Sequence, residues 1–532
     1  MRNYRPLIMG RRGAVASNHP LSTQAGLDIL RSGGNAVDAA VATSLTLGVV
    51  EPNMSGLGAD GFYHAFVAQT GDARVYNGTG SAPAAATRDR YARGMPPSGP
   101  LSVSTPGALG ALAAMHAAHG RLPWARLCER AIEHARDGYP VTHAYRRYAQ
   151  EMLARISADA RTRSVFLRDG EPLPLASILR QPDLARTLEE VAAEGAETFY
   201  RGKLAKRLAA GMAEAGALVT ASDLAACRPD MQEPIAVTYR GYTVKQTPPN
   251  SMGFVLLQML KTVERFDLKA MDPAERLHVL IEAKKRAFLD RERYASDPRR
   301  SPVPLERLLS ESLAIDNAAA IDMKRAAVLP VNEPEKADGD TTYFCVVDAD
   351  GNAVSAIQSH NSAYGSGVTA GDTGVLLNNR MSTWHRAPGH PNQLEPGKRV
   401  RHTMNAPMVF RDGRLWCVLG TPGADNQVQI NLQMLVAMID LGDDPQAAVE
   451  APRWSSGQRG QPANWPHEGS NALTVESDFS PGMLAELEQR GHVLKRVDPL
   501  DGPCSVQIIR VTEEGVRMAG SDPRRDGWAG AY

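Results

Sequence analysis

An abrupt change of pattern after Pro330 limits the architectures open to this chain of 532 residues. Residues 331–340, VNEPEKADGD, are acidic and turn-forming, and they run directly into an apolar segment that begins at Thr341. Such a junction predicts an exposed loop followed by a buried strand. Before it, residues from about 107 onward mostly follow helical spacing, whereas strand-like segments predominate after it. We therefore expect an α+β protein whose helices lie mainly in 1–340.

Individual elements can be predicted from spacing and from end signals. Apolar residues at helical spacing predict helices over 108–119, 124–137 and 274–294, and an Ala-rich helix over about 35–49. A further helix is expected to start from a Ser22 cap and to end near Ile29, before Gly33-Gly34. Turn residues separate two expected strand pairs, 341–347 with 352–359 and 406–410 with 415–419.

Composition excludes several classes of function. Lys plus Arg and Asp plus Glu both total 59, so there is no excess positive charge to hold nucleic acid or an anionic membrane. No run approaches the roughly 18 apolar residues of a membrane span, and the basic opening segment lacks the apolar stretch of a secretory signal. We expect a cytoplasmic protein. The five cysteines are scattered and no HExxH motif occurs, so neither a disulfide framework nor a metal site is indicated.

One glycine motif fails its context test. Residues 56–61, GLGADG, fit the dinucleotide fingerprint GxGxxG. That fingerprint works only between a strand and a helix whose N-terminus meets the pyrophosphate, whereas a strand-like run follows here. The sequence also has no GxSxG elbow and no phosphate-binding GxxxxGK[ST] loop. A nucleotide-binding role is therefore not predicted.

A threonine at the head of a strand usually satisfies only local backbone groups, and Thr341 gains significance from the other motifs of the chain. These occur in order at 33–42 (GGNAVDAAVA), 104–107 (STPG), 239–242 (YRGY), 282–284 (EAK), 290–291 (DR), 341–342 (TT), 346–348 (VVD), 351–354 (GNAV), 377–379 (LNN), Met381, 420–423 (GTPG), 520–524 (GSDPR) and 530–532 (GAY). On these stretches the sequence resembles the γ-glutamyltransferase family of N-terminal nucleophile (Ntn) hydrolases over essentially its whole length.

The resemblance implies a four-layer αββα sandwich that is made as one proenzyme and cuts itself between Asp340 and Thr341. Residues 1–340 would form a large subunit and residues 341–532 a small one, interwoven in one domain. The resemblance leaves open whether two such heterodimers pair. Cleavage would free the α-amine of Thr341, and because the pKa of such an amine is about 7.7–8.0, one residue can supply both nucleophile and base. No cofactor or metal is implied.

Further roles follow position by position from the resemblance. Ser359 matches a hydroxyl that supports the nucleophile, and Asn361 matches a substrate-binding amide. The backbone N–H groups of Gly423 and Ala424 match the pair that forms the oxyanion hole, in which main-chain donors stabilise the tetrahedral oxygen. The alternative for 420–423 is a plain Pro-Gly turn.

The departures from the family concern the part that holds a γ-glutamyl group. The family binds the α-carboxylate of this group with an arginine, and the matching position here falls at or near Thr79. The acidic residue that binds the α-amine is replaced by Thr383. Its neighbour in the family, Gln or Glu, is replaced by Arg380. The paired serines align with His402 and Thr403. Losing the acid removes the counter-charge for an ammonium, while Arg380 adds a planar fork that suits a carboxylate. Arg380 could instead form an ion pair or lie at the surface, and His402 could be structural.

These changes favour a small amide substrate that has a carboxylate and no α-amino group. In this respect the chain is similar to the oxamate amidohydrolases, cytoplasmic enzymes of purine breakdown that convert oxamate to oxalate and ammonia. Alternatives are a γ-glutamyl hydrolase or transferase, such as a glutathione hydrolase, with a rebuilt binding site, and an acylase for glutaryl (cephalosporin-type) side chains. A non-enzymatic alternative is an uncut binding or scaffold protein.

Overall fold

Two seven-stranded sheets form the centre of the protein in the computed structural model, which describes residues 4–329, 340–458, 463–464 and 470–532. The loop predicted at 331–340 lies outside the described residues except for Asp340. The first sheet has the order β21 (Trp528–Ala531), β2 (Ala14–Ser17), β12 (Asp340–Val347), β13 (Ala353–Asn361), β3 (Asp60–Val67), β4 (Asp72–Gly78) and β9 (Asp230–Gln232). The second has the order β1 (Ile8–Gly10), β20 (Arg517–Ser521), β19 (Gln507–Val511), β15 (Arg414–Gly420), β14 (Met408–Arg411), β11 (Tyr242–Gln246) and β10 (Ile235–Tyr239).

Alternation along β12 explains how the sheets are layered. Tyr343, Cys345 and Val347 join the apolar core between the two sheets. Phe344 and Val346 point the other way, into a core that the first sheet shares with its helices. Because successive strand residues face opposite sides of a sheet, a strand that is apolar at every position must be covered on both faces.

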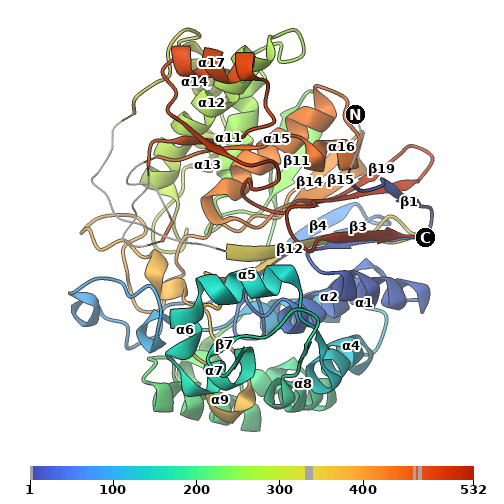
Figure 1. Ribbon diagram of the computed structural model, residues 1–532, viewed down its shortest axis with the longest axis vertical. Helices are drawn as coiled ribbons and strands as arrows, with labels where there is room; N and C mark the ends of the chain where they lie inside the picture. The colour runs from blue at the N-terminus through green and yellow to red at the C-terminus, as the bar shows by residue number, and fades with distance from the viewer. Residues whose placement is uncertain (1–3, 330–339, 459–462, 465–469) are drawn as a thin grey trace.

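Helices cover the outer face of each sheet (Figure 1). The first sheet is covered by α1 (Pro20–Arg31), α2 (Ala36–Val50), α3 (Ala108–His119), α4 (Trp124–Asp137), α5 (His143–Glu151), α6 (Leu153–Ser157), α7 (Ala160–Phe166), α8 (Pro182–Glu194), α9 (Lys203–Ala215) and α10 (Ala221–Ala226). The second is covered by α11 (Gly253–Val263), α12 (Pro273–Tyr294), α13 (Leu305–Leu308), α14 (Glu311–Ala319), α15 (Gln427–Ile439), α16 (Pro445–Glu450) and α17 (Pro481–Gln489). This arrangement confirms the expected αββα sandwich.

The topology joins strands from both sides of residue 340. β12 and β13 are hydrogen-bonded neighbours at the middle of the first sheet, between β2 and β3. The second sheet likewise combines β1, β10 and β11 with four strands from the later part of the chain. Within the described ranges, three short sheets lie outside this sandwich: β5 (Tyr139–Pro140) with β8 (Ile178–Leu179), β6 (Leu167–Arg168) with β7 (Glu171–Pro172), and β16 (Trp454–Ser456), β17 (Leu473–Glu476) and β18 (Leu494–Val497).

Most predicted helices are confirmed to within a residue or two, and the first one starts earlier than expected. α1 begins at Pro20, and the imidazole of His19 accepts the cap hydrogen bond from the N–H of Leu21. Proline suits this first helical position because its φ is already helical and it has no N–H to satisfy. The Ser22 hydroxyl instead donates to the carbonyl of Thr43 in α2, at 2.8 Å. None of the helices in the described ranges is both long and apolar enough to cross a membrane.

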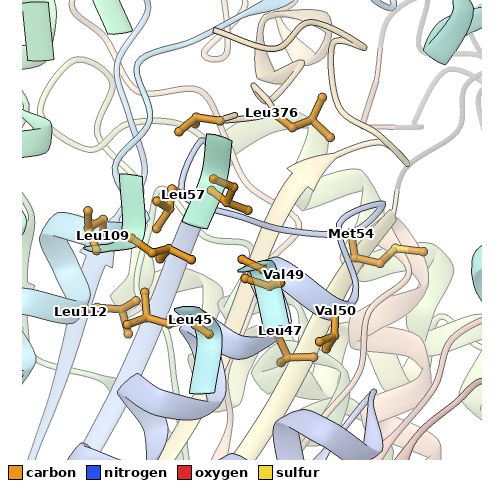
Figure 2. Close-up of a cluster of buried hydrophobic side chains, with 14 of the residues drawn as sticks. Leu45, Leu47, Val49, Val50, Met54, Leu57, Leu109, Leu112 and Leu376 are labelled. Atoms are coloured by element: carbon orange, nitrogen blue, oxygen red, sulfur yellow. The ribbon is translucent and has the colours of Figure 1, made fainter. Parts of the chain in front are cut away.

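The glycine-rich turn at 56–59 is built into the core and leads directly into β3, as the context test predicted. Figure 2 shows Leu57 packed with Leu45 and Val49 of α2 and with Leu109 of α3. Gly58 is required because a Cβ there would lie 2.1 Å from the carbonyl oxygen of Leu376. The turn therefore holds the first residue of β3, Asp60, in a defined place.

Candidate active site

Thr341 lies at the head of β12 with only 2% of its surface exposed. Its hydroxyl donates a hydrogen bond of 3.1 Å to the hydroxyl of Ser359 on the neighbouring strand β13. The same Ser359 oxygen accepts a 2.7 Å bond from the backbone N–H of Asn361. The ladder is irregular between Asp340 and Thr342, and such bulges re-aim side chains at strand ends. The predicted nucleophile and its supporting hydroxyl are thus in contact.

Asn361 ends β13 in a left-handed conformation, with φ +85°. Its amide nitrogen donates to Ser382 and to the backbone carbonyl of Asn379, and its carbonyl oxygen accepts a 2.8 Å bond from Nη1 of Arg380. Because the amide is held from both sides, the end of β13 is fixed to the 3₁₀ turn Arg380–Thr383. The predicted substrate-binding amide therefore lies between Thr341 and Arg380.

Arg380 is 2% exposed and pairs with Asp60, which is completely buried. Nε of Arg380 lies 3.3 Å from Oδ2 of Asp60, so the ion-pair alternative is correct for this nitrogen. Nη2 of the same guanidinium is buried and has no hydrogen-bond partner among the described residues. Burial raises the pKa of Asp60 to about 6 despite the opposing effect of Arg380, and burial lowers the pKa of Arg380 to about 10.

His402 is completely buried and approaches the same oxygen of Asp60 that Arg380 contacts. Its Nε2 lies 3.8 Å from Oδ2 of Asp60, and neither ring nitrogen has a hydrogen-bond partner in the described part of the chain. Burial holds the pKa of His402 well below its ordinary value, so the ring is neutral. Two of the predicted binding residues, Arg380 and His402, therefore converge on one carboxylate.

The hydroxyls of Thr79 and Thr383 are used within the protein. Thr79 donates to Asn77 at 2.7 Å and accepts from Asn250 at 3.1 Å. Thr383 donates to the backbone carbonyl of Arg380 at 2.7 Å. Thr403 is buried, and its carbonyl accepts from the side-chain amide of Asn405. The hydroxyls of Thr79 and Thr383 therefore have structural partners, and substrate binding by the three threonines stays a prediction.

Gly423 and Ala424 follow the end of β15 in left-handed conformations, with φ +116° and +48°. A Cβ at position 423 would lie 2.2 Å from the sulfur of Cys504, so only glycine fits there. Neither backbone amide has an acceptor among the residues that the structure describes. The turn is tied to the strand that carries Thr341, because Gly420 packs directly against the ring of Tyr343.

Sequence reasoning missed Asp60 and the purpose of Asn378. Asp60 sits inside the rejected glycine motif, and an acid at the start of an apolar strand was the signal that could have identified it. The side chain of Asn378 accepts from the Ser104 hydroxyl and from the backbone N–H of Arg380, and it donates to the carbonyl of Gly58. It therefore holds together three of the segments that form the site.

Comparison with known proteins identifies the family. The model of the gamma-glutamyltranspeptidase family matches residues 22–532. The chain belongs to this family. Among curated members, it is 38% identical to the glutathione hydrolase-like YwrD proenzyme of Bacillus subtilis, over 98% of this chain and 99% of the relative. It is 35% identical to the oxamate amidohydrolase proenzyme of Klebsiella pneumoniae subsp. pneumoniae, over 98% of each.

A solved structure shows the same architecture over the whole chain. The crystal structure of cephalosporin acylase from Bacillus halodurans superimposes with a TM-score of 0.92 at 35% identity, covering 100% of this chain and 98% of the acylase. Three relatives with differently named activities thus resemble the chain to nearly the same degree. Overall similarity therefore does not select a substrate, and the site residues must.

Proposed function

We propose that this member of the family is an autoprocessing hydrolase of amide bonds in which Thr341 is the nucleophile. The observation that carries the proposal is the buried contact between the Thr341 and Ser359 hydroxyls. Asn361 links this contact to Arg380, whose Nη2 has no hydrogen-bond partner in the described part of the chain. The relatives named as proenzymes support processing of the chain, and we place the cut between Asp340 and Thr341. Large and small fragments would then remain together through their shared sheets.

The mechanism uses the new N-terminus. The α-amine of Thr341 takes the hydroxyl proton while the oxygen attacks the amide carbonyl. The Gly423 and Ala424 N–H groups stabilise the tetrahedral oxyanion, and ammonia or an amine leaves with the proton. Water, activated by the same amine, then hydrolyses the acyl-enzyme and restores Thr341. In the present geometry Ser359 orients the Thr341 oxygen.

The substrate we favour is a small carboxylate amide without an α-amino group, with oxamate, giving oxalate and ammonia, as the first candidate. Arg380 supplies the carboxylate fork, with Asn361 fixing its orientation and His402 beside it. The negative charge of Asp60 is already paired with Arg380, and Thr383 has no negative charge that could bind the ammonium group of an amino acid. The glutathione hydrolase, cephalosporin acylase and uncut-scaffold alternatives each predict a different outcome below. A cytoplasmic location and a dimer of heterodimers stay predictions.

The decisive experiment measures ammonia release from oxamate by the purified protein, beside release of the aniline from a γ-glutamyl anilide and of glutarate from a glutaryl amide. Rapid turnover of oxamate alone supports the proposal. Turnover of the γ-glutamyl or glutaryl compound instead would assign the chain to the corresponding alternative. A chain that stays uncut after prolonged incubation and is inactive on all three would favour the scaffold.

A further inference from the structure

Asp60 is a buried acid to which the mechanism above assigns no task. Its Oδ1 accepts a 2.8 Å hydrogen bond from the backbone N–H of Gly80. Among the described residues, its Oδ2 has a 3.3 Å contact to Nε of Arg380 as its one hydrogen bond and lies 3.8 Å from Nε2 of His402. A buried carboxylate normally requires close ionic and hydrogen-bonding partners. Asp60 is therefore held weakly on the side that faces Arg380.

The guanidinium of Arg380 is itself only partly used. Nη1 makes the short bond to Asn361, which fixes the plane of the group. The opposite edge, formed by Nε and Nη2, is the one that can receive both oxygens of a carboxylate. Asp60 touches only Nε on this edge, and Nη2 has no partner among the described residues. A second carboxylate could use the whole edge, but only by replacing Asp60 on Nε.

We propose that Asp60 is an exchangeable counter-ion: the substrate carboxylate displaces it from Arg380, and Asp60 takes up one proton from solvent as the substrate binds. The inference rests on the function proposed above for Arg380. Two carboxylates beside one buried guanidinium repel each other, so the resident one is neutralised. Asp60 thus makes the site selective for carboxylates that can outcompete an internal one by binding through two hydrogen bonds.

The surroundings of Asp60 leave it as the group that titrates near neutral pH. The groups that face it, from every element for which an electrostatic contact is found, are Arg380, Arg399, His402, Tyr63, Tyr200 and Cys227. Burial keeps the pKa values of both tyrosines above their usual range and raises the pKa of Cys227 to about 12, so these groups stay neutral. His402 is also neutral, and Arg399 is engaged by Asp230.

The direction of the pH effect follows from this exchange. Below the pKa of free Asp60, about 6, the acid is already protonated and affinity for a carboxylate should not depend on pH. Above it, binding requires uptake of a proton. The affinity should then fall by up to about tenfold for each pH unit until the pKa of Asp60 in the complex is reached.

The test measures binding of oxalate, a carboxylate that cannot be hydrolysed here, to the processed protein by calorimetry between pH 5.5 and 8. Buffers with different ionisation enthalpies report how many protons are taken up. We expect uptake approaching one proton near pH 7.5 in the wild type and none in Asp60→Asn, which should bind oxalate with little pH dependence. Asp440→Asn is the matched control, because Asp440 pairs with Arg240 away from the site and should leave the uptake unchanged.

The outcomes separate this inference from the proposed function. If oxalate binding takes up a proton but oxamate is not hydrolysed, the exchange at Asp60 is supported and only oxamate is excluded as the substrate. Oxamate hydrolysis with no proton uptake by the wild type overturns the exchange alone. Failure of the wild type to bind oxalate or oxamate overturns both. If Asp60→Asn does not fold, wild-type uptake between about pH 6.5 and 7 carries the test, because the α-amine of Thr341, whose pKa is about 7.7–8.0, is still protonated there.

Discussion

The hydroxyl of Thr341 donates to the hydroxyl of Ser359 across 3.1 Å, between two adjacent strands at the middle of a sheet. Both side chains are almost completely buried, so the contact orients the Thr341 oxygen before any substrate arrives. It also joins the residue at the proposed cut to a strand that runs antiparallel beside it.

Replacing Thr341 by alanine should leave an intact, inactive chain, because the attacking oxygen is removed. Mass spectrometry and a denaturing gel should show one species of 532 residues in place of fragments of 340 and 192 residues. Thr342→Val is the control, since the Thr342 hydroxyl contacts Asn18 and its loss should permit cleavage. A Thr341→Ala chain that still splits at the same bond would show that the nucleophile is misassigned.

Ser359→Ala should slow both self-cleavage and turnover. The variant leaves the Thr341 hydroxyl and the Asn361 N–H without their shared partner, a loss of about 1–3 kcal/mol, which corresponds to roughly 5- to 150-fold in rate. Time courses of self-cleavage and steady-state measurements of kcat would determine the loss in rate. Ser355→Ala removes a comparable hydrogen bond, to Tyr343 on the same pair of strands, and should affect stability while leaving processing fast.

Gly423→Ala should lower kcat by about 100- to 1,000-fold, the scale of losing an oxyanion donor. The new methyl group would collide with Cys504 at a backbone conformation that disfavours alanine, and the turn would have to move. Adding Cys504→Ala should restore part of the activity by making room. Gly442→Ala is the control, because its φ is also positive and nothing lies within 4 Å. Full activity of Gly423→Ala would contradict an oxyanion role for this turn.

Arg380→Lys should raise KM for a carboxylate amide at least about tenfold, because a lysine keeps the charge but lacks the two-pronged edge. Steady-state kinetics on oxamate and on a neutral amide such as acetamide would separate the effects. Only the substrate that carries a carboxylate should lose affinity. Arg207→Lys, which changes an arginine paired with Glu190 near the surface, should leave KM unaltered. Equal losses on both amides would indicate a purely structural Arg380.

Asp522→Asn should destabilise the fold by about 3–5 kcal/mol, because it breaks a fully buried network with Arg453 and Arg524. Burial by itself raises the pKa of Asp522, but the two guanidiniums outweigh it and the pKa lies below its ordinary value. The stabilisation is therefore present above pH 4 and is lost as the pH falls through the native pKa.

Thermal unfolding at pH 7 and pH 3 tests whether the stabilisation by Asp522 is lost in acid. The Asp522→Asn variant should melt well below the wild type at pH 7, and the difference should narrow in acid. Asp412→Asn should melt with the wild type at both pH values, since the Asp412 side chain is 91% exposed. A constant difference at the two pH values would show that the charge of Asp522 is not what stabilises the network.

Much of the architecture could be predicted because it depends on local pattern. The helices at 108–119 and 124–137 have the expected ends, and the apolar run after Thr341 is a strand covered on both faces. The dinucleotide-binding interpretation of residues 56–61 could be rejected from local pattern too, since a strand follows the glycines. Spacing reports which side of an element is buried, and that is sufficient to define the layers of the sandwich.

The sequence alone therefore determined the strand headed by Thr341, the layers around it and the residues that differ from the family. Only the tertiary structure decided how those residues are used. Asp60 and Arg380 are 320 positions apart and meet because β3 lies next to β13, whose end is tied to the Arg380 turn. Periodicity carries no information about which distant element supplies a partner. The charge that Arg380 meets, and the Nη2 that it leaves without a partner among the described residues, are consequences of packing.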